Sequence, residues 1–276
     1  MRASSRLAVC LAVFFAFFGL AVLGGGCAPR TIVVVDPYPC GDGGANGCPP
    51  GLLDDLVGYW RLNDPAGSTA ARDSSGWSND AALVGLDAST AWVAGGPEGR
   101  ALSVQGQGYA NVRASASVDS ITSAVTVAAW VFLQGTVPEY ATAISRQIGT
   151  GFEQHYHLSV NAGGQAILFI TTPTSGQVVL GSPMNALVPQ QTWVHLAGSW
   201  DGSVARLYVN GAEVDSLPAS GRFDAETNPV VLSGNGNGGD HAVSEAIPGL
   251  LDGVMLYRRA LSAGEVARIA AGALLP

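Results

Sequence analysis

Residues 192–214, TWVHLAGSWDGSVARLYVNGAEV, carry the clearest local signal in the chain. Asn210 and Gly211 separate two runs of alternating apolar and polar residues, and this pair suits a two-residue type I′ hairpin because both positions need a positive φ. Successive side chains of a strand point to opposite faces, so we expect Leu207 and Tyr208 on opposite sides. The stretch therefore predicts two antiparallel strands with one buried face.

Similar short segments recur along the rest of the chain, each bounded by turn residues. They are VGYWRL, ALVGL, ALSVQG, TVAAWVFL, ATAISR, HYHLSV, AILFIT, PVVLSG and GVMLYRR. Many short strands and no long amphipathic helix predict an all-β fold with two antiparallel sheets, a sandwich or jelly roll. One short C-terminal helix is expected in SAGEVARIAAGA, with Ser262 as N-cap and Glu265 as its capping-box partner.

The composition favours one compact domain and argues against a nucleic-acid partner. The chain has 276 residues, 47% of them hydrophobic, with 37 Gly and 12% charged residues. These values suit a single turn-rich domain of up to about 250 residues. Without residues 1–26 the chain carries 11 basic and 21 acidic residues, a net charge of −10. A chain this acidic, with no basic stripe, lacks the positive charge that binding to phosphates requires.

Residues 1–26 have the pattern of a secretory signal peptide. MRASSR supplies two positive charges, a run of 17 apolar residues follows, and small residues come at its end. The run is short for a membrane-spanning helix, which needs about 20 residues. The sequence therefore predicts that the domain is exported.

Cys27 follows three glycines, and this site resembles the lipobox of bacterial lipoproteins. In that family the Cys is acylated and becomes the first residue of the mature chain, so the resemblance implies a lipid anchor on the membrane. The family prefers Leu three residues before the Cys, whereas Leu23 lies four before it. Ordinary signal cleavage near Gly26 or Ala28 is the alternative. If the lipobox is used, Ala28 implies, by the same resemblance, an outer-membrane or cell-surface location.

Residues 27–54 are rich in Pro and Gly and lack the periodicity of a domain. They predict a tether that precedes one domain over residues 55–276. In an oxidising compartment Cys40 and Cys48 can form a disulfide that closes a nine-residue loop. A zinc site is the weaker alternative, because two Cys with no nearby His cannot complete a tetrahedral zinc shell.

Several motifs together resemble the laminin-G-like, concanavalin A-like jelly-roll family found in many bacterial surface proteins. YWRLND, DSSG, AAWVFL, the stretch 192–214 and LLDGVMLYRRALSAGEVARI occur in that family's order. The likeness extends from Leu52 to Gly272 and implies two antiparallel sheets of about six or seven strands, packed face to face. ALSVQG and the residues after DSSG depart from the family pattern, which weakens any transfer of fine ligand specificity.

Residues 72–80, RDSSGWSND, are the candidate metal loop. Its Asp, Ser and Asn side chains offer the oxygens that calcium prefers. The alternative is a loop that Asx turns stabilise without a metal. The family resemblance adds a carboxylate from the motif before the last strand, and so implies Asp73, Asn79 and Asp252 as ligands of a structural calcium.

Three other patterns carry weaker chemistry. Glu213 and Asp215, expected to face the same way along a strand, resemble part of the carboxylate ladder of laminarinase-type glucanases, but Pro218 stands where the third acid belongs. His155 and His157 share a strand face and suit zinc only with a third ligand, so two half-exposed histidines are the favoured interpretation. SGNGNGGDH has the glycine spacing of a dinucleotide loop, but no helix can follow it, so a plain loop is expected.

These observations favour a non-catalytic binding module, because no GxSxG motif or spare Cys offers a nucleophile. The family resemblance and the export signal together imply a membrane-tethered protein of the cell envelope that binds a glycan or an envelope or extracellular protein. Trp77 and Trp92 are candidates for sugar stacking, with packing under a loop as the favoured alternative, and His195 is expected to be packed in the sandwich. The alternative functions are a structural or adhesive envelope protein and, less favoured, a glycoside hydrolase on the same fold.

Overall fold

The structure is a computed structural model that describes residues 51–149, 153–236 and 243–274. The predicted signal peptide, the lipobox cysteine and the predicted disulfide lie outside these ranges, so export, lipid anchoring and the disulfide stay predictions. No helix within these ranges combines the length and the apolar character needed to cross a membrane.

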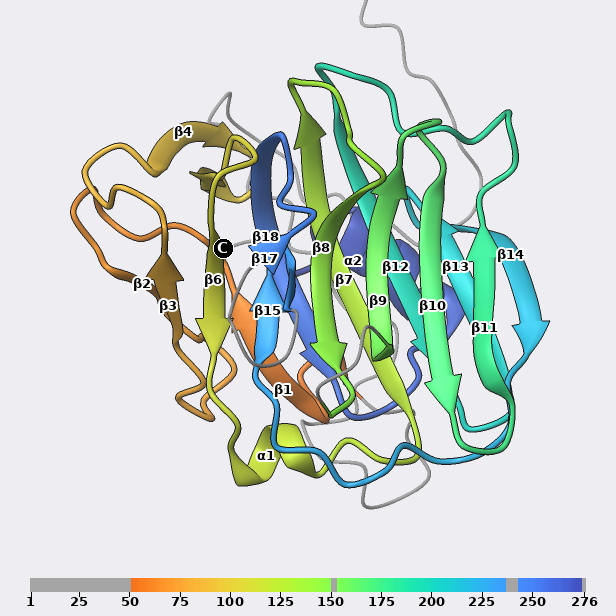
Figure 1. Ribbon diagram of the computed structural model, residues 1–276. Helices are drawn as coiled ribbons and strands as arrows, with labels where there is room; N and C mark the ends of the chain where they lie inside the picture. The colour runs from red at the N-terminus through yellow and green to blue at the C-terminus, as the bar shows by residue number, and fades with distance from the viewer. Residues whose placement is uncertain (1–50, 150–152, 237–242, 275–276) are drawn as a thin grey trace, which may run out of the picture. The chain divides into compact units, whose positions relative to one another are not determined.

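Two antiparallel sheets pack face to face in the described residues, as predicted (Figure 1), and each has eight strands, where the family resemblance implied about six or seven. The first sheet contains, in spatial order, β14 (Ala212–Pro218), β13 (Val204–Val209), β12 (Trp193–Trp200), β7 (Val125–Leu133), β18 (Gly249–Tyr257), β5 (Gly99–Ser103) and β4 (Trp92–Gly96), and β1 (Leu56–Trp60) pairs with β18. The second sheet contains β11 (Gly176–Gly181), β10 (Ala166–Thr172), β9 (Gln154–Asn161), β8 (Tyr140–Gln147), β15 (Val230–Leu232), β6 (Tyr109–Val112), β3 (Ala81–Val84) and β2 (Ala70–Ala71). The other elements are the short strand pair β16 (Asn235–Gly236) and β17 (Val243–Ser244) and the helices α1 (Ala116–Asp119) and α2 (Ala263–Ala270).

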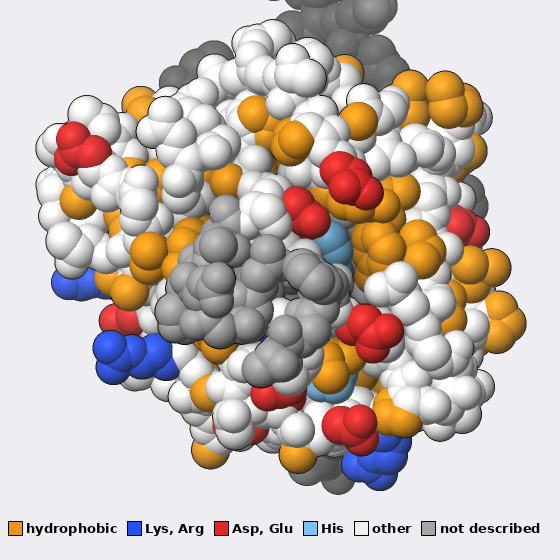
Figure 2. Space-filling model, in the orientation of Figure 1, with side chains coloured by type: hydrophobic (Ala, Val, Ile, Leu, Met, Phe, Trp, Pro, Cys, Tyr) orange, Lys and Arg blue, Asp and Glu red, His pale blue; other side chains and the backbone are white. Residues whose placement is uncertain are grey.

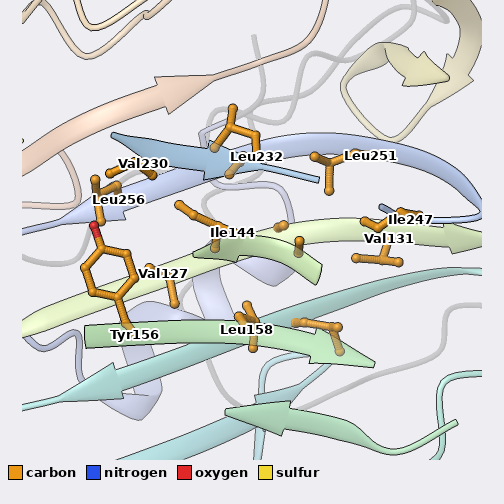
Figure 3. Close-up of a cluster of buried hydrophobic side chains, with 14 of the residues drawn as sticks. Val127, Val131, Ile144, Tyr156, Leu158, Val230, Leu232, Ile247, Leu251 and Leu256 are labelled. Carbon is orange, nitrogen blue, oxygen red and sulfur yellow. The ribbon is translucent and has the colours of Figure 1, made fainter. Parts of the chain in front are cut away.

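The facing surfaces of the two sheets form the main hydrophobic core. Alternate residues of each strand point inward, as the sequence pattern predicts. Val127 of the first sheet lies in the same buried cluster as Ile144, Leu158 and Leu232 of the second (Figure 3). Full burial of one such side chain stabilises the fold by roughly 1.5–3 kcal/mol. Apolar contact between the sheets therefore holds the sandwich together.

The hairpin between β13 and β14 has the predicted geometry. Asn210 has a φ of 49° and Gly211 a φ of 80°, the two positive values of a type I′ turn. Leu207 lies in the main core, whereas Tyr208 lies in a second hydrophobic cluster. The alternation of the strand is therefore confirmed.

Helix α2 covers part of the outer face of the first sheet. The Ser262 hydroxyl accepts a hydrogen bond from the Glu265 N–H, and the Glu265 carboxylate accepts one from the Ser262 N–H, which confirms the predicted capping box. Val266 and Ile269 of the helix pack into the second hydrophobic cluster. Leu52 is buried in the same cluster, so the packing of the domain includes a residue before position 55.

Candidate functional site

One carboxylate holds the predicted metal loop, residues 72–80, together. Asp73 Oδ1 accepts hydrogen bonds from the backbone N–H groups of Tyr59 and Ser75, at 2.9 and 2.8 Å. Asp73 Oδ2 accepts from the Ser75 hydroxyl at 2.7 Å and from the Asn79 N–H at 2.9 Å. A carboxylate has about four lone-pair sites, and these donors fill them. The contacts match the alternative interpretation, an Asx-turn loop that stabilises itself.

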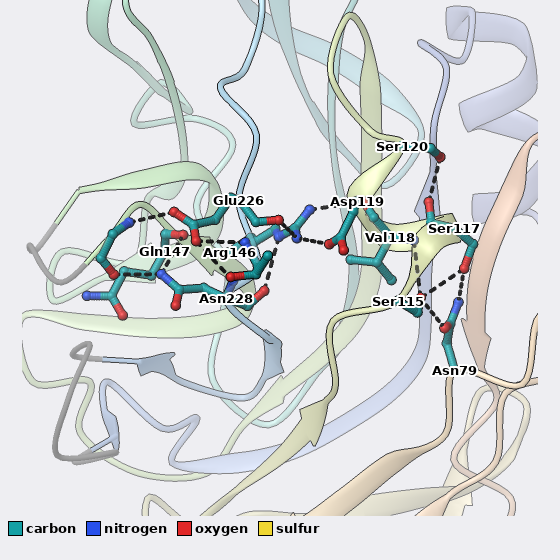
Figure 4. A network of polar contacts seen from close by, with 12 residues as sticks. Asn79, Ser115, Ser117, Val118, Asp119, Ser120, Arg146, Gln147, Glu226 and Asn228 are labelled. Carbon is teal, nitrogen blue, oxygen red and sulfur yellow. Dashed lines mark hydrogen bonds and ion pairs between the residues drawn. The ribbon is translucent and has the colours of Figure 1, made fainter.

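Asn79 connects this loop to helix α1. Its amide donates to the Val57 carbonyl at 2.8 Å and to the Ser117 hydroxyl at 2.9 Å. Its Oδ1 accepts from the Ser115 hydroxyl at 2.7 Å, and Ser115 in turn caps α1 by accepting from the Val118 N–H (Figure 4). The side chain of Asn79 is therefore engaged within the protein at both ends of its amide.

Arg146, which the sequence did not single out, extends the same region of polar contacts. It is 2% exposed. Its guanidinium pairs with Asp119 and donates to the Val118 carbonyl. It also donates to the carbonyls of Glu226 and Asn228 (Figure 4). A buried charge persists only when it is paired and hydrogen-bonded, so Arg146 joins α1 to the loop before β15.

Asp252, the third predicted ligand, has other neighbours. Its Oδ2 accepts the Glu98 N–H and its Oδ1 accepts the Gly253 N–H, both at 2.9 Å. Trp60 lies between it and the loop, because Trp60 bridges to Asp73 on one side and pairs with β18 on the other. In the three described ranges no group of three or more His, Cys, Asp or Glu side chains is arranged to hold a metal. The structure brings the two loop residues together and places Asp252 apart, so a calcium ion in the loop would have to be held without Asp252.

Asp252 and Glu98 form a buried acidic pair. Burial raises the pKa of Asp252 to about 7, and the Glu98 carboxylate adds to the rise, while backbone N–H groups oppose it. Burial also raises the pKa of Glu98, against the hydrogen bond from the Tyr59 hydroxyl at 2.6 Å and the charge of Arg61. Asp252 is 0% exposed and Glu98 8%, so neither carboxylate is open to a ligand.

A β-bulge divides the predicted carboxylate pair of β14. Tyr208 pairs with Glu213 and Leu207 pairs with Asp215, so Val214 is the extra residue. Leu207 and Tyr208 face opposite sides of the sheet, and the expectation that the two acids face the same way is therefore wrong. Asp215 instead accepts a hydrogen bond at 3.1 Å from a backbone N–H at the end of β11, in the other sheet.

The two histidines of β9 are buried, which corrects the expectation that they are half-exposed. His155 and His157 are each 2% exposed. They share the outer face of the second sheet because Tyr156, between them, points into the main core. His155 packs against Phe223, with ring centroids 4.8 Å apart, and burial followed by the charge of Arg146 lowers the pKa of His155. His157 has both aromatic neighbours and polar partners.

The remaining aromatic predictions have different outcomes. His195 is packed as expected, with its ring centroid 5.1 Å from that of Trp130, and burial lowers the pKa of His195 to about 4. Trp92 is buried and donates to a backbone carbonyl at 2.8 Å, which confirms the packing interpretation. Trp77 is 49% exposed, but the Arg258 guanidinium lies 5.6 Å from its ring centroid and occupies part of the ring face.

A continuous row of side chains crosses the outer face of the second sheet. The strand register places these residues opposite one another, from β6 to β11: Asn111, Val231, Ser145, His157, Phe169 and Val179. Val179, at the edge, is 45% exposed. Figure 2 looks onto this side of the molecule and shows histidine and acidic side chains beside hydrophobic ones. The face therefore combines polar and apolar groups.

The middle of this row holds a group that we call the His157 cluster. Its members are His157, Thr142, Asn235, Glu245, Tyr140 and Phe169. The Thr142 hydroxyl lies 2.6 Å from His157 Nε2 and donates to the Glu245 carboxylate at 2.8 Å. The same carboxylate lies 3.3 Å from His157 Nε2. Phe169 stacks on the His157 ring at 5.0 Å, and Tyr140 meets both rings edge-on.

Glu245 keeps its charge in this cluster. Burial alone would raise its pKa, but the hydrogen bond and charge of His157, followed by the hydrogen bonds of Thr142 and Asn235, lower the pKa below its usual value. The side chain is 20% exposed. Its φ is 68°, a left-handed conformation that is uncommon for residues with a Cβ. Such strain persists where surrounding contacts impose it, often at functional sites.

Sequence reasoning found one member of this cluster, His157, and missed its partners. Thr142 and Glu245 are 103 residues apart, and no local motif connects them. The available signal was HYH itself, two histidines on one face of a strand.

Comparison with known families gives one match. The Laminin_G_3 family model, described as the concanavalin A-like lectin/glucanases superfamily, matches residues 105–267. This range covers more than half of the chain and contains the hairpin and the His157 cluster. No curated protein matches the sequence.

Solved structures share the fold at low sequence identity. The binding domain of Paraclostridial Mosquitocidal Protein 1 has a TM-score of 0.60 and 16% identity, and the match covers 81% of this chain and 53% of that one. Domain 4 of AbnA, a GH43 extracellular arabinanase from Geobacillus stearothermophilus solved with arabinotriose, has a TM-score of 0.56, 20% identity and coverages of 78% and 98%. The binding domain of Botulinum Neurotoxin DC in complex with SialylT has a TM-score of 0.57, 10% identity and coverages of 80% and 52%. At these identities the likeness shows the fold alone.

Proposed function

The chain belongs to the concanavalin A-like lectin/glucanases superfamily, and from this premise we propose that it is a non-catalytic module that binds a glycan through the His157 cluster. One observation carries the proposal. Glu245 is charged, partly exposed and held beside aromatic rings on the outer face of the second sheet.

The chemistry of the cluster suits a polyhydroxyl ligand. A carboxylate accepts hydrogen bonds from hydroxyl groups, and an amide such as that of Asn235 both donates and accepts. Aromatic side chains such as Tyr140 offer apolar ring faces, which match the C–H face of a sugar ring. Specific sites commonly combine an apolar lining with a few fixed polar groups, as this cluster does.

Further polar atoms lie on and beside the outer face of the second sheet. Four of them are buried and make no hydrogen bond within the part of the chain that the structure describes: Asn111 Oδ1, Ser159 Oγ, Thr171 Oγ1 and Asn235 Oδ1. A buried polar atom without a partner costs about 1–3 kcal/mol. Because these atoms are buried, a ligand rich in hydroxyl groups could bond them only by displacing the side chains that cover them.

The arrangement of acids argues against glycoside hydrolysis. Retaining and inverting mechanisms both use two carboxyl groups that flank the bond to be cleaved. The His157 cluster pairs Glu245 with a histidine and a hydroxyl, not with a second acid. The acids of β14 face opposite sides of the sheet, and the Asp252–Glu98 pair is buried.

The fold neighbours support a binding role. The mosquitocidal protein and the neurotoxin matches are binding domains, and the arabinanase domain was solved with arabinotriose. We extend a carbohydrate ligand to this chain as part of the proposal. The secretory signal and the lipobox-like Cys27 support a place in the cell envelope, on the outer membrane or cell surface. An envelope protein as ligand, or a purely adhesive role, is the alternative.

A glycan array with purified protein tests the proposal. The variant Glu245→Gln keeps the size of the side chain and removes its charge, and we expect about tenfold weaker binding, the loss of one charge-assisted hydrogen bond. Glu213→Gln is the matched control, because Glu213 is exposed on β14, away from the cluster. Equal binding by both variants and the wild type, or no glycan bound at all, would contradict the proposal.

A further inference from the structure

A second row of side chains lies on the outer face of the first sheet. The register places Trp193 of β12 opposite Phe132 of β7, Phe132 opposite Leu250 of β18, and Leu250 opposite Ser103 of β5. All four side chains are half-buried. Their chain neighbours Val194, Val131, Leu251 and Leu102 lie in the main core, so the row points outward. We call this row the aromatic strip.

The rings of the aromatic strip are fixed in place. The centroids of Phe132 and Trp193 are 5.3 Å apart and the rings are tilted by 48°. The indole N–H of Trp193 donates to the Gly95 carbonyl at 3.0 Å. Helix α2 packs elsewhere on this face, since its cluster contains none of the strip residues. The strip is thus a partly open surface in which two aromatic rings are in contact.

Exposed glutamines border the aromatic strip. The Gln105 amide donates to the Gln134 side-chain oxygen at 2.8 Å and to the Ser103 hydroxyl at 3.2 Å. The Gln190 amide donates to the Gly135 carbonyl at 3.2 Å. Each of the three glutamines is exposed and retains groups that can bond a ligand.

The segments that form the aromatic strip and its border contain no ionisable residue. They are SVQGQG (103–108), FLQGTVP (132–138), VPQQTW (188–193) and IPGLL (247–251). The whole chain, by contrast, has a net charge of −8. These four segments offer apolar and neutral hydrogen-bonding groups to a ligand, while the next row on the same face holds the buried side chains of His195 and Asp252.

We propose that the aromatic strip is a second binding site, which takes a neutral oligosaccharide. The aromatic rings offer stacking surfaces for sugar rings, and the glutamine amides donate to and accept from sugar hydroxyls. A charged polysaccharide would meet no opposite charge here. A stable protein partner buries about 800 Å² on each side, whereas the strip rings are half-buried and narrow. The site lies on the opposite sheet from the His157 cluster and does not depend on the function proposed for that cluster.

Isothermal titration with uncharged hexaoses of glucose, xylose and arabinose tests the site. Phe132→Ala removes a strip ring, and the double variant Gln134→Ala/Gln190→Ala removes only exposed amides, so the latter keeps the test valid if the former folds poorly. We expect each to weaken binding of the same hexaose by about five- to tenfold, as the loss of one stacking or hydrogen-bonding contact predicts. Binding should not change between 50 and 500 mM NaCl, values that span a large change in screening of charges.

Glu245→Gln separates this proposal from the function proposed above. It should leave hexaose binding at the aromatic strip unchanged. Three results would overturn the strip proposal: no hexaose bound by the wild type, hexaose binding lost in Glu245→Gln but kept in the strip variants, or hexaose binding unchanged in both strip variants.

Discussion

Asp73 and Asp252 lie on either side of β1 and meet opposite environments. Asp73 is half-buried and accepts four hydrogen bonds. Two come from Ser75, one from the Asn79 N–H, and one from the Tyr59 N–H of the neighbouring strand β1. Asp252 is fully buried, accepts only two backbone N–H groups and has the Glu98 carboxylate nearby. Donors stabilise a carboxylate charge, whereas burial and a second acid oppose it. Asp73, with many donors and partial burial, therefore stabilises a turn as a carboxylate, whereas the buried Asp252–Glu98 pair has few donors and holds a proton more tightly.

The largest expected effect is on the pH dependence of folding stability, to which Asp252 contributes. Asp252 has a pKa raised from 3.8 to about 7 by burial. Between these pH values the folded chain keeps a proton that the unfolded chain loses, so stability falls as pH rises, by up to roughly 1.4 kcal/mol per pH unit. The contribution is fully present below about pH 4. Urea unfolding from pH 4 to 8 measures it.

Asp252→Asn should flatten this pH profile, because the amide cannot titrate. The raised pKa of Glu98 acts in the same direction, so a smaller slope remains in the variant. If the free energy of unfolding instead rose between pH 4 and 7, and by the same amount in the wild type and in Asp252→Asn, the proposed role of Asp252 would be contradicted.

The sequence predicted local features well and distant ones poorly. Asn210 and Gly211 fix a turn by their own backbone preferences, and Ser262 and Glu265 form a cap three residues apart. Glu98 and Asp252 meet across 154 residues, and only the completed pairing of β4, β5 and β18 brings them together. No spacing rule reaches that far.

Two predictions about β-strands were wrong because general rules have local exceptions. One rule is that side chains alternate along a strand, and the other is that polar side chains are exposed. The bulge at Val214 moved Asp215 to the face opposite Glu213, and bulges leave no clear mark in sequence. His155 and His157 were expected to be half-exposed because polar side chains usually reach solvent. Phe223 packs against His155 and Phe169 stacks on His157 instead, and both neighbours come from other segments of the chain.

Removing the Asp73 carboxylate should have the next largest effect. Asp73→Ala leaves the buried Tyr59 N–H and the Asn79 N–H without their acceptor, and we expect a loss of about 2–4 kcal/mol in the free energy of unfolding. Asp87→Ala is the control, because Asp87 accepts two hydrogen bonds from Ser89 in an exposed turn. Denaturant unfolding at pH 7 measures both, and similar midpoints for the two variants would show that the loop does not depend on Asp73.

Removing the Tyr59 hydroxyl, which donates to Glu98 of the acidic pair, should have a smaller effect on the free energy of unfolding. Tyr59→Phe removes the 2.6 Å hydrogen bond to Glu98 and should cost about 1–2 kcal/mol at pH 7. Tyr257→Phe is a matched control, since among the described residues the Tyr257 hydroxyl bonds the Met255 sulfur alone, at 3.9 Å. The cost of Tyr59→Phe should grow as pH rises, because the bond is stronger to an ionised carboxylate. If Tyr59→Phe lost the same stability at pH 5 and at pH 8, the hydrogen bond would not depend on the charge of Glu98.

Calcium should have the smallest effect, because the oxygens of the two regions do not converge. A cation at residues 72–80 would have to displace the donors that fill Asp73, and Asp252 lies beyond β1. Selective binding to the folded state raises stability by RT ln(1 + [L]/Kd), about 2.7 kcal/mol when calcium is at 100 times its Kd. We therefore expect the same thermal midpoint in 1 mM calcium and in chelator. A midpoint raised by calcium in the wild type, and not in Asp73→Ala, would restore the loop as a metal site; a rise abolished only by Asp252→Asn would move that site to the acidic pair.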